Sequence, residues 1–515
     1  MRNISRFIQR LCVVLLPWLS VAAHAQDWQE LSIADIMRGY QSGEISSEAL
    51  TRYYLQRIQT LDQQTGVNAV VTLNPDALAD AIAADQQRAA GNGTGALHGV
   101  PMLIKDNIDV KGLPTTGGSL ALKHNIASSD AFLVAQLRAA GAIIVGKTNM
   151  AEWAFSPNVT VSSVAGMTRN PYNLLHTTAG SSGGTGAGVA ANFAVAGIGT
   201  DTGNSIRGPS SHNALVGIRS TMGLTSRMGV IPLYLRNDIA GPMARSVADA
   251  ATILQVIATA DPADPATRHR PDNVDRNYLQ ALNTDALQGA RIGVMRYYTQ
   301  QASIDPAVLP LFEQALADLR AQGAVLVEDF AIAGFEDLIQ NNWCNTFQDD
   351  VNQYLSQQTH AFATRSLAQV LESGLFLPSV AGSLNSMVEN ARTNAQCPDL
   401  FEHERNIHFR EAVLSAMQSS GVDALVYPTW SHPARLIGDN SGPTGDNSQH
   451  IAPHTGLPTI TVPMGYNADG LPSGLSLLGP LYSEAQLIGF AYSYEQATKH
   501  RRAPELATAQ HNEQD

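Results

Sequence analysis

The chain has 515 residues, of which 44% are hydrophobic and 15% charged; this is the composition of an ordinary globular protein, but the length exceeds that of one simple core. The formal net charge of −13 argues against nucleic acid and against an anionic membrane surface as partners. Length and composition therefore predict one large α/β unit or two closely packed ones.

The first 25 residues have the features of a secretory signal peptide. Three arginines precede an apolar run at 11–23, and an Ala-His-Ala cleavage site ends at Ala25. The run contains Pro17 and is shorter than the roughly 20 residues that a membrane-spanning helix needs. We therefore expect cleavage after Ala25, a periplasmic or secreted mature chain over 26–515, and no membrane association after cleavage.

Short apolar runs alternate with helical patterns along the chain, which predicts a mixed sheet with helices on its faces. Ser46 or Ser47 can cap a first helix, Asn74-Pro75 opens a second, and a third is expected near 130–140. A segment rich in Pro and charge at 260–275 predicts a linker or surface excursion. Strands are expected at 69–73, 102–104, 142–145, 193–198, 291–295, 324–328, 424–428 and 459–463.

The stretch 180–207 places two serine-bearing glycine turns around one short helix and one short strand. Glycines let the backbone approach a ligand closely, and the small hydroxyl side chains of such turns add polar chemistry without filling the space. This pattern predicts a nucleophile with an oxyanion hole. A flexible linker is the alternative, but a linker would lack the apolar run at 193–198.

Lys105 directly follows the apolar run at 102–104. A lysine at the end of a buried strand loses hydration when charged, so its pKa falls and the neutral amine becomes available as a base. The alternative is that Lys105 pairs with Asp106 or reaches solvent. The neighbouring serine turns favour the base.

Three segments, GVPMLIKDN at 99–107, GSSGG at 180–184 and GTDTGNSIRGP at 199–209, together resemble the signatures of the amidase signature family of serine hydrolases. Their order and spacing match, and the similarity covers nearly the whole mature chain. The resemblance implies an α/β domain with a mixed, mostly parallel, twisted sheet of about eleven strands flanked by helices. The signature core would span about 85–255. The family hydrolyses linear amides with a Ser-Ser-Lys triad and uses no metal or other cofactor.

Matched by position, the resemblance makes Ser205 the nucleophile, Ser181 the bridging serine beside a cis peptide, and Lys105 the base. The oxyanion hole and substrate contacts would come from Thr202, Gly203, Asn204 and Ser205. Supporting positions match Ser182, Thr200, Asp201 and Arg207. The expected partner is a small-molecule carboxamide, or an aryl amide, ester or carbamate, and the expected assembly is a homodimer.

Several positions beside the nucleophile depart from the family pattern. Asn204 stands where glycine is usual, and Gly208 where a larger residue is usual. His-Asn-Ala at 212–214 and GIRST at 217–221 replace Phe-Cys-Gly and Gly-Leu-Lys-Pro-Thr. Asparagine tolerates a positive φ, so we expect the turn to be preserved and the departures to bear on substrate identity. Pocket walls are expected from 335–410, whose aromatic residues line either the pocket or the core: Trp343, Phe347, Tyr354, Phe376 and Phe401.

Three other functions fit parts of the pattern. GSSGG also matches the G-x-S-x-G elbow of an α/β-hydrolase with Ser182, Asp423 and His454 as triad, although no strand pattern precedes it. An exported α/β chain of this size also suits a periplasmic solute-binding protein. The glutaminase component of a tRNA-dependent amidotransferase shares the signatures, but its partners are cytosolic, which the predicted export opposes.

Two cysteines, Cys344 and Cys397, remain once the predicted signal is removed. An oxidising compartment favours disulfides, but the sequence does not show whether the two Cα atoms approach. A disulfide and a pair of buried free thiols both stay open.

Overall fold

The computed structural model describes residues 28–271, 273–300, 304–358, 362–439 and 445–506. The predicted signal segment lies outside the described residues. Within the described ranges, every helix is too short or too polar to cross a membrane.

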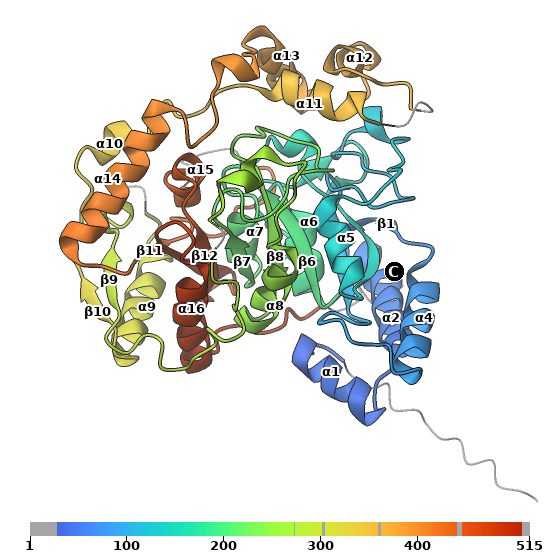
Figure 1. The fold of residues 1–515 in the computed structure, drawn as a ribbon, viewed down its shortest axis with the longest axis horizontal. Coiled ribbons are helices and arrows are strands. Elements are labelled where there is room, and N and C mark those ends of the chain that lie inside the picture. Colours follow the sequence, from blue (N-terminus) through green and yellow to red (C-terminus); the bar gives the residue numbers. More distant parts are fainter. Residues whose placement is uncertain (1–27, 272, 301–303, 359–361, 440–444, 507–515) are drawn as a thin grey trace, which may run out of the picture.

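An eleven-stranded mixed sheet runs through the molecule (Figure 1), and it confirms the expected fold class. The strand order is β1-β3-β2-β6-β8-β7-β12-β13-β11-β9-β10. Parallel contacts form two blocks, β3-β2-β6 and β11-β9-β10, whereas the strands between these blocks pair antiparallel. The strands of this sheet are β1 Val70–Leu73, β2 Pro101–Lys105, β3 Ile143–Thr148, β6 Ala196–Asp201, β7 Val216–Arg219, β8 Ile239–Ala244, β9 Arg291–Val294, β10 Val325–Val327, β11 Ala424–Pro428, β12 Thr459–Tyr466 and β13 Pro472–Leu478; β4 Val161–Ser162 and β5 Gly166–Met167 pair with each other in a separate sheet.

The eight expected strands all overlap strands of this sheet, and three more strands, β7, β8 and β13, were not expected. Strand β8 reads IAGPMA and β13 reads PSGLSLL. Glycine and proline are depleted in strands, so these segments carry a weak local signal. Pairing with strands on both sides outweighs that weak propensity.

The helices cover both faces of the sheet (Figure 1). The first two expected helices are α2, whose N-cap Ser46 accepts a hydrogen bond from the Ala49 N–H, and α4. The third is α5. The α-helices are α1 Ile33–Ser42, α2 Ser47–Arg57, α3 Gln63–Thr65, α4 Ala77–Ala89, α5 Phe132–Ala139, α6 Gly183–Ala190, α7 Arg207–His212, α8 Val247–Ile257, α9 Leu309–Ala321, α10 Phe335–Leu338, α11 Phe347–Ser356, α12 Leu367–Ser373, α13 Ala381–Glu389, α14 Glu404–Ser420, α15 Ala452–Thr455 and α16 Glu484–Thr498.

The alternation of side chains along β2 decides where Lys105 points. Met102 and Ile104 belong to the large core cluster that also contains residues of α8 and α16, whereas Leu103 belongs to a second cluster with residues of α6. Residues two apart share a face of a strand, so Lys105 lies on the same face as Leu103. Helix α6 packs this closely because it is glycine-rich: a Cβ at Gly188 would lie 3.0 Å from the Leu103 side chain.

Two regions outside the sheet bear on the site. Helices α11, α12 and α13 form a layer of their own at the top of Figure 1, and α11 buries Phe347 and Tyr354 in a cluster with Trp153.

The segment 260–275 is not a free linker over its first half, because Asp264 forms a buried ion pair with Arg227. Contacts of this kind hold the excursion against the body of the domain.

Candidate active site

The predicted base and bridging serine meet at the end of β2. Lys105 is the last residue of this strand and is fully buried; its Nζ donates to Ser181 Oγ at 2.7 Å and to Thr200 Oγ1 at 2.7 Å. Ser181 precedes α6, and the Gly180–Ser181 peptide is cis, as the resemblance implied. Strand β6 is the parallel neighbour of β2, so both strands end at the same edge of the sheet.

The surroundings of Lys105 favour its neutral form. Burial lowers the pKa of this amine from 10.5 to about 7, although the charges of Asp201 and Asp238 raise it. Asp106 does not pair with Lys105; its carboxylate lies 3.2 Å from Nζ of Lys147, so the salt-bridge alternative for Lys105 was wrong. The site therefore holds an amine that can accept a proton near neutral pH.

The predicted nucleophile lies on the turn between β6 and α7. Ser205 is 5% exposed, and its Oγ donates to Oδ1 of Asn204 at 3.2 Å. In the part of the chain that the structure describes, no hydrogen bond joins Ser205 to Ser181. A relay from Ser205 to Lys105 therefore requires the Ser205 hydroxyl to leave Asn204 and turn towards Ser181.

The backbone of the turn 202–205 is available to a ligand. Among the described residues, no acceptor is paired with the N–H groups of Thr202, Gly203, Asn204 or Ser205. Buried N–H groups are normally paired, so a set of free donors beside a pocket suits an oxyanion. Neither Gly203 nor Asn204 has a positive φ, so the turn forms without the left-handed conformation that asparagine would tolerate.

Ion pairs at Asp201 hold this turn. Its carboxylate lies 2.9 Å from Arg207 Nε and 2.9 Å from Arg219 Nη1. Burial raises the pKa of Asp201, but the two guanidinium charges outweigh burial and lower it to about 2. Arg207 also donates to the Gly203 carbonyl at 2.7 Å. Arg219, which the sequence analysis did not single out, lies in the departing segment 217–221.

Two hydroxyl groups hold the end of β6 and the turn that follows it. Ser182 Oγ donates to the Thr200 carbonyl at 3.1 Å, and Thr202 Oγ1 donates to Asp238 at 2.5 Å. These contacts place Ser182 and Thr200 in a buried supporting layer. Asp238 was another residue that sequence reasoning missed.

The Ser182 triad finds no support in this arrangement. Asp423 accepts a hydrogen bond from the Arg291 N–H at 2.8 Å, where β9 and β11 begin. The ring of His454 packs edge-on against Trp343, with centroids 4.4 Å apart. No hydrogen bond among the described residues links either of them to Ser182.

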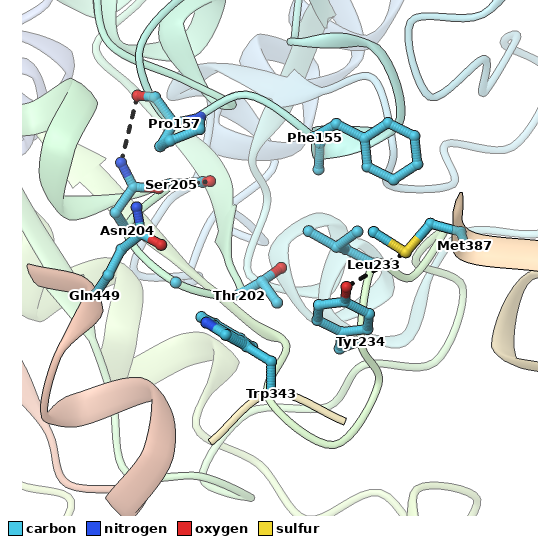
Figure 2. Close-up of a pocket in the computed structure, with 12 residues that line it drawn as sticks. Phe155, Pro157, Thr202, Asn204, Ser205, Leu233, Tyr234, Trp343, Met387 and Gln449 are labelled. Atoms are coloured by element: carbon cyan, nitrogen blue, oxygen red, sulfur yellow. Dashed lines mark hydrogen bonds between the residues drawn. The ribbon is translucent and has the colours of Figure 1, made fainter. Parts of the chain in front are cut away.

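A pocket of about 240 Å³ opens onto Ser205 (Figure 2). Asn204, Ser205 and Gln449 lie at one end, whereas Phe155, Leu233, Tyr234 and Met387 form an apolar end. Of the five aromatic candidates from 335–410, Trp343 is in the lining, and the other four pack in hydrophobic clusters. The lining residues are Ala154, Phe155, Pro157, Thr202, Gly203, Asn204, Ser205, Leu233, Tyr234, Trp343, Met387 and Gln449.

Two of the departures from the family pattern fit each other. A Cβ at Gly208 would lie 2.8 Å from Nδ2 of Asn204 and 2.9 Å from Cζ3 of Trp430. The missing side chain at 208 therefore gives room to the extra side chain at 204. The ring of His212, a third departure, packs on Trp430 with centroids 4.8 Å apart.

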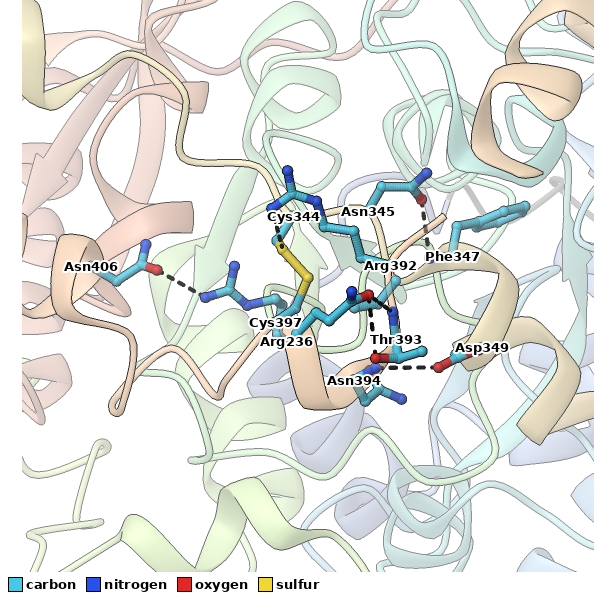
Figure 3. Close-up of a disulfide and its surroundings, with 12 residues drawn as sticks. Arg236, Cys344, Asn345, Phe347, Asp349, Arg392, Thr393, Asn394, Cys397 and Asn406 are labelled. Carbon is cyan, nitrogen blue, oxygen red and sulfur yellow. Dashed lines mark hydrogen bonds between the residues drawn. A yellow bond between two sulfur atoms is a disulfide. The ribbon is translucent and has the colours of Figure 1, made fainter. Parts of the chain in front are cut away.

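A disulfide joins Cys344 to Cys397, with Cα atoms 5.9 Å apart (Figure 3). This bond decides between the two alternatives that the sequence left open. Cys344 directly follows Trp343, so the bridge holds one wall of the pocket to the segment that precedes α14.

Comparison with known proteins adds independent evidence. The family model for amidases matches residues 49–488. The structure of a peptide amidase from Stenotrophomonas maltophilia is similar over 93% of this chain and 99% of its own, with a TM-score of 0.83 and 38% identity. A probable amidase of Arabidopsis thaliana is 32% identical over 93% of this chain and 92% of its own. A glutamyl-tRNA(Gln) amidotransferase component of Acinetobacter baumannii is 34% identical over 92% of this chain and 97% of its own. The chain therefore belongs to the amidase signature family.

Proposed function

We propose that the protein is an exported, cofactor-free amidohydrolase that cleaves a linear carboxamide through an acyl-enzyme on Ser205. The observation that carries this proposal is the hydrogen bond between Lys105 Nζ and Ser181 Oγ, which is 2.7 Å long. Both side chains are fully buried, and the pKa of the Lys105 amine is lowered to about 7. A neutral amine hydrogen-bonded to a serine can take a proton relayed from a second serine, as an imidazole does in other hydrolases.

The reaction follows from these positions. Ser205 Oγ attacks the substrate carbonyl carbon while its proton passes to Ser181 and the Ser181 proton passes to neutral Lys105. The N–H groups of the turn 202–205 stabilise the oxyanion. The proton then returns through Ser181 to the leaving nitrogen, the C–N bond breaks and ammonia departs. Water hydrolyses the acyl group from Ser205 by the same relay.

The pocket favours a substrate with a large apolar acyl group. Phe155, Leu233 and Met387 can surround such a group while the carboxamide lies at the polar end. The similarity to a peptide amidase supports hydrolysis at a carboxamide rather than transfer of ammonia to a tRNA-bound partner. Export is supported by the N-terminal 25 residues, and N-terminal sequencing of the mature protein is expected to begin at Gln26.

The nucleophile is tested by Ser205→Ala, with Ser182→Ala as the comparison variant. Ser205→Ala is expected to lower ammonia release from N-acetyl-L-phenylalanine amide at least about 1,000-fold, because no other group attacks the carbonyl. A fluorophosphonate probe is expected to label Ser205 in peptide mapping of the unmodified enzyme. Full activity of Ser205→Ala, or labelling of Ser182 in place of Ser205, would contradict the assignment.

A further inference from the structure

The side chain of Gln449 lies beside the oxyanion turn, where neither the signatures nor the triad assigns it a role. A Cβ at Gly203 would lie 3.4 Å from Oε1 of Gln449 and 3.3 Å from Cη2 of Trp343. Figure 2 shows Gln449 next to Asn204, at the end of the pocket opposite Phe155 and Met387. A substrate lying over Gly203 therefore meets the amide group of Gln449.

Asp446 determines which end of that amide faces the pocket. Nε2 of Gln449 donates to Oδ2 of Asp446 at 2.8 Å, while Oδ1 of Asp446 accepts from Ser448. Burial raises the pKa of Asp446 to about 7, so above that pH this carboxylate is ionised and can only accept. The amide nitrogen must then face Asp446. Among the described residues no donor is paired with Oε1, which leaves this acceptor for a ligand.

The position of Ser181 indicates which part of the substrate carries the donor that reaches Oε1 of Gln449. The leaving nitrogen of the substrate must face Ser181, which returns the proton to it. Ser181 is held by Lys105, and among the described residues Gln449 is in the pocket lining whereas Ser181 is not. The donor that reaches Gln449 is therefore on the acyl side of the scissile bond. An N–H on the carbon next to the carbonyl satisfies this geometry, and the side chain on that carbon can enter the apolar end.

We propose that Gln449, oriented by Asp446, accepts a hydrogen bond from an acylamino N–H of the substrate, so that the enzyme selects N-acylated amino acid amides and peptide amides over simple aliphatic or aryl amides. This inference rests on the proposed amidohydrolase function. A site built to pair a substrate N–H discriminates against an analogue that lacks it, because the acceptor is then left without a partner.

Two amides that differ in one group test the proposal. N-acetyl-L-phenylalanine amide carries the N–H, and (S)-2-acetoxy-3-phenylpropanamide has an ester oxygen in its place; ammonia release at about pH 8 reports cleavage of the carboxamide alone. The unmodified enzyme is expected to prefer the first compound by about tenfold in kcat/KM. Gln449→Met keeps the length of the side chain and is expected to reduce that preference to near one.

Leu233→Ala is the matched control, because Leu233 lines the same pocket without a polar group. It is expected to lower kcat/KM for both compounds by a similar factor and to keep the preference. A preference that survives in Gln449→Met, or that Leu233→Ala abolishes equally, overturns the inference. If the unmodified enzyme cleaves neither compound, the inference also fails. If the fluorophosphonate still labels Ser205 in that case, only the proposed substrate class is wrong. If Ser205 is not labelled, the proposed amidohydrolase function is wrong as well.

Discussion

The buried amine of Lys105 makes the pH dependence of turnover a quantitative test of the proposed base. With a pKa of about 7, roughly 90% of this lysine is neutral at about pH 8, against about 0.3% for an amine with a pKa of 10.5. Burial therefore raises the amount of active base about 300-fold at that pH. Because the neutral form is the reactive one, kcat/KM is expected to fall about tenfold for each pH unit below about 7.

The assay is ammonia release from N-acetyl-L-phenylalanine amide between about pH 5 and about pH 9, with circular dichroism at each pH to exclude unfolding. The charge of Asp238 raises the pKa of Lys105, so Asp238→Asn is expected to move the acid limb to lower pH. Glu313→Gln, which removes a half-exposed carboxylate paired with Arg296, is the control and should leave the limb in place. An activity maximum near pH 5, or an acid limb that Asp238→Asn does not move, would refute the lysine base.

Two further predictions concern the walls of the site. Replacing Cys344 or Cys397 by serine opens a loop closed over a sequence separation of 53 residues, so we expect urea denaturation to show a loss of about 4 kcal/mol and KM to rise as Trp343 loosens; an unchanged midpoint would contradict this. Gly208→Ala brings a Cβ within 2.8 Å of Asn204 and 2.9 Å of Trp430, so thermal unfolding should show a loss of about 1–3 kcal/mol and kcat should fall. Adding Asn204→Gly should restore part of the loss, and equal stability of all three proteins would count against the coupling of positions 204 and 208.

Much of the fold could be read from local pattern. The apolar runs at 102–104, 424–428 and 459–463 lie in β2, β11 and β12, because apolar runs of this kind fit a strand buried on both faces. Strands β8 and β13 were not predicted, because their glycines and prolines disfavour strand formation locally. Pairing with neighbouring strands in the sheet outweighs that local preference.

The active site also has parts that the sequence predicted and parts that it did not. The glycine turns and the lysine after a buried strand could be recognised because each is a short segment whose residue types constrain the backbone around it. Lys105 does donate to Ser181 and Thr200, but the hydroxyl of Ser205 faces Asn204. Which rotamer a buried hydroxyl adopts depends on every neighbour, and those neighbours come from several elements.

The sequence by itself determined eight of the eleven strands of the large sheet, three of its helices, the family and the segments that carry the proposed triad, because these depend on residues close together in the chain. The tertiary structure alone decided the ion-pair partner of Asp106, the ion pair between Arg219 and Asp201, the Cys344–Cys397 bond and which residues line the pocket. Each of these joins side chains whose approach is decided by how the strands and helices pack. Such contacts leave no signal in any local window, since the energy of packing depends on the whole sheet and its helices.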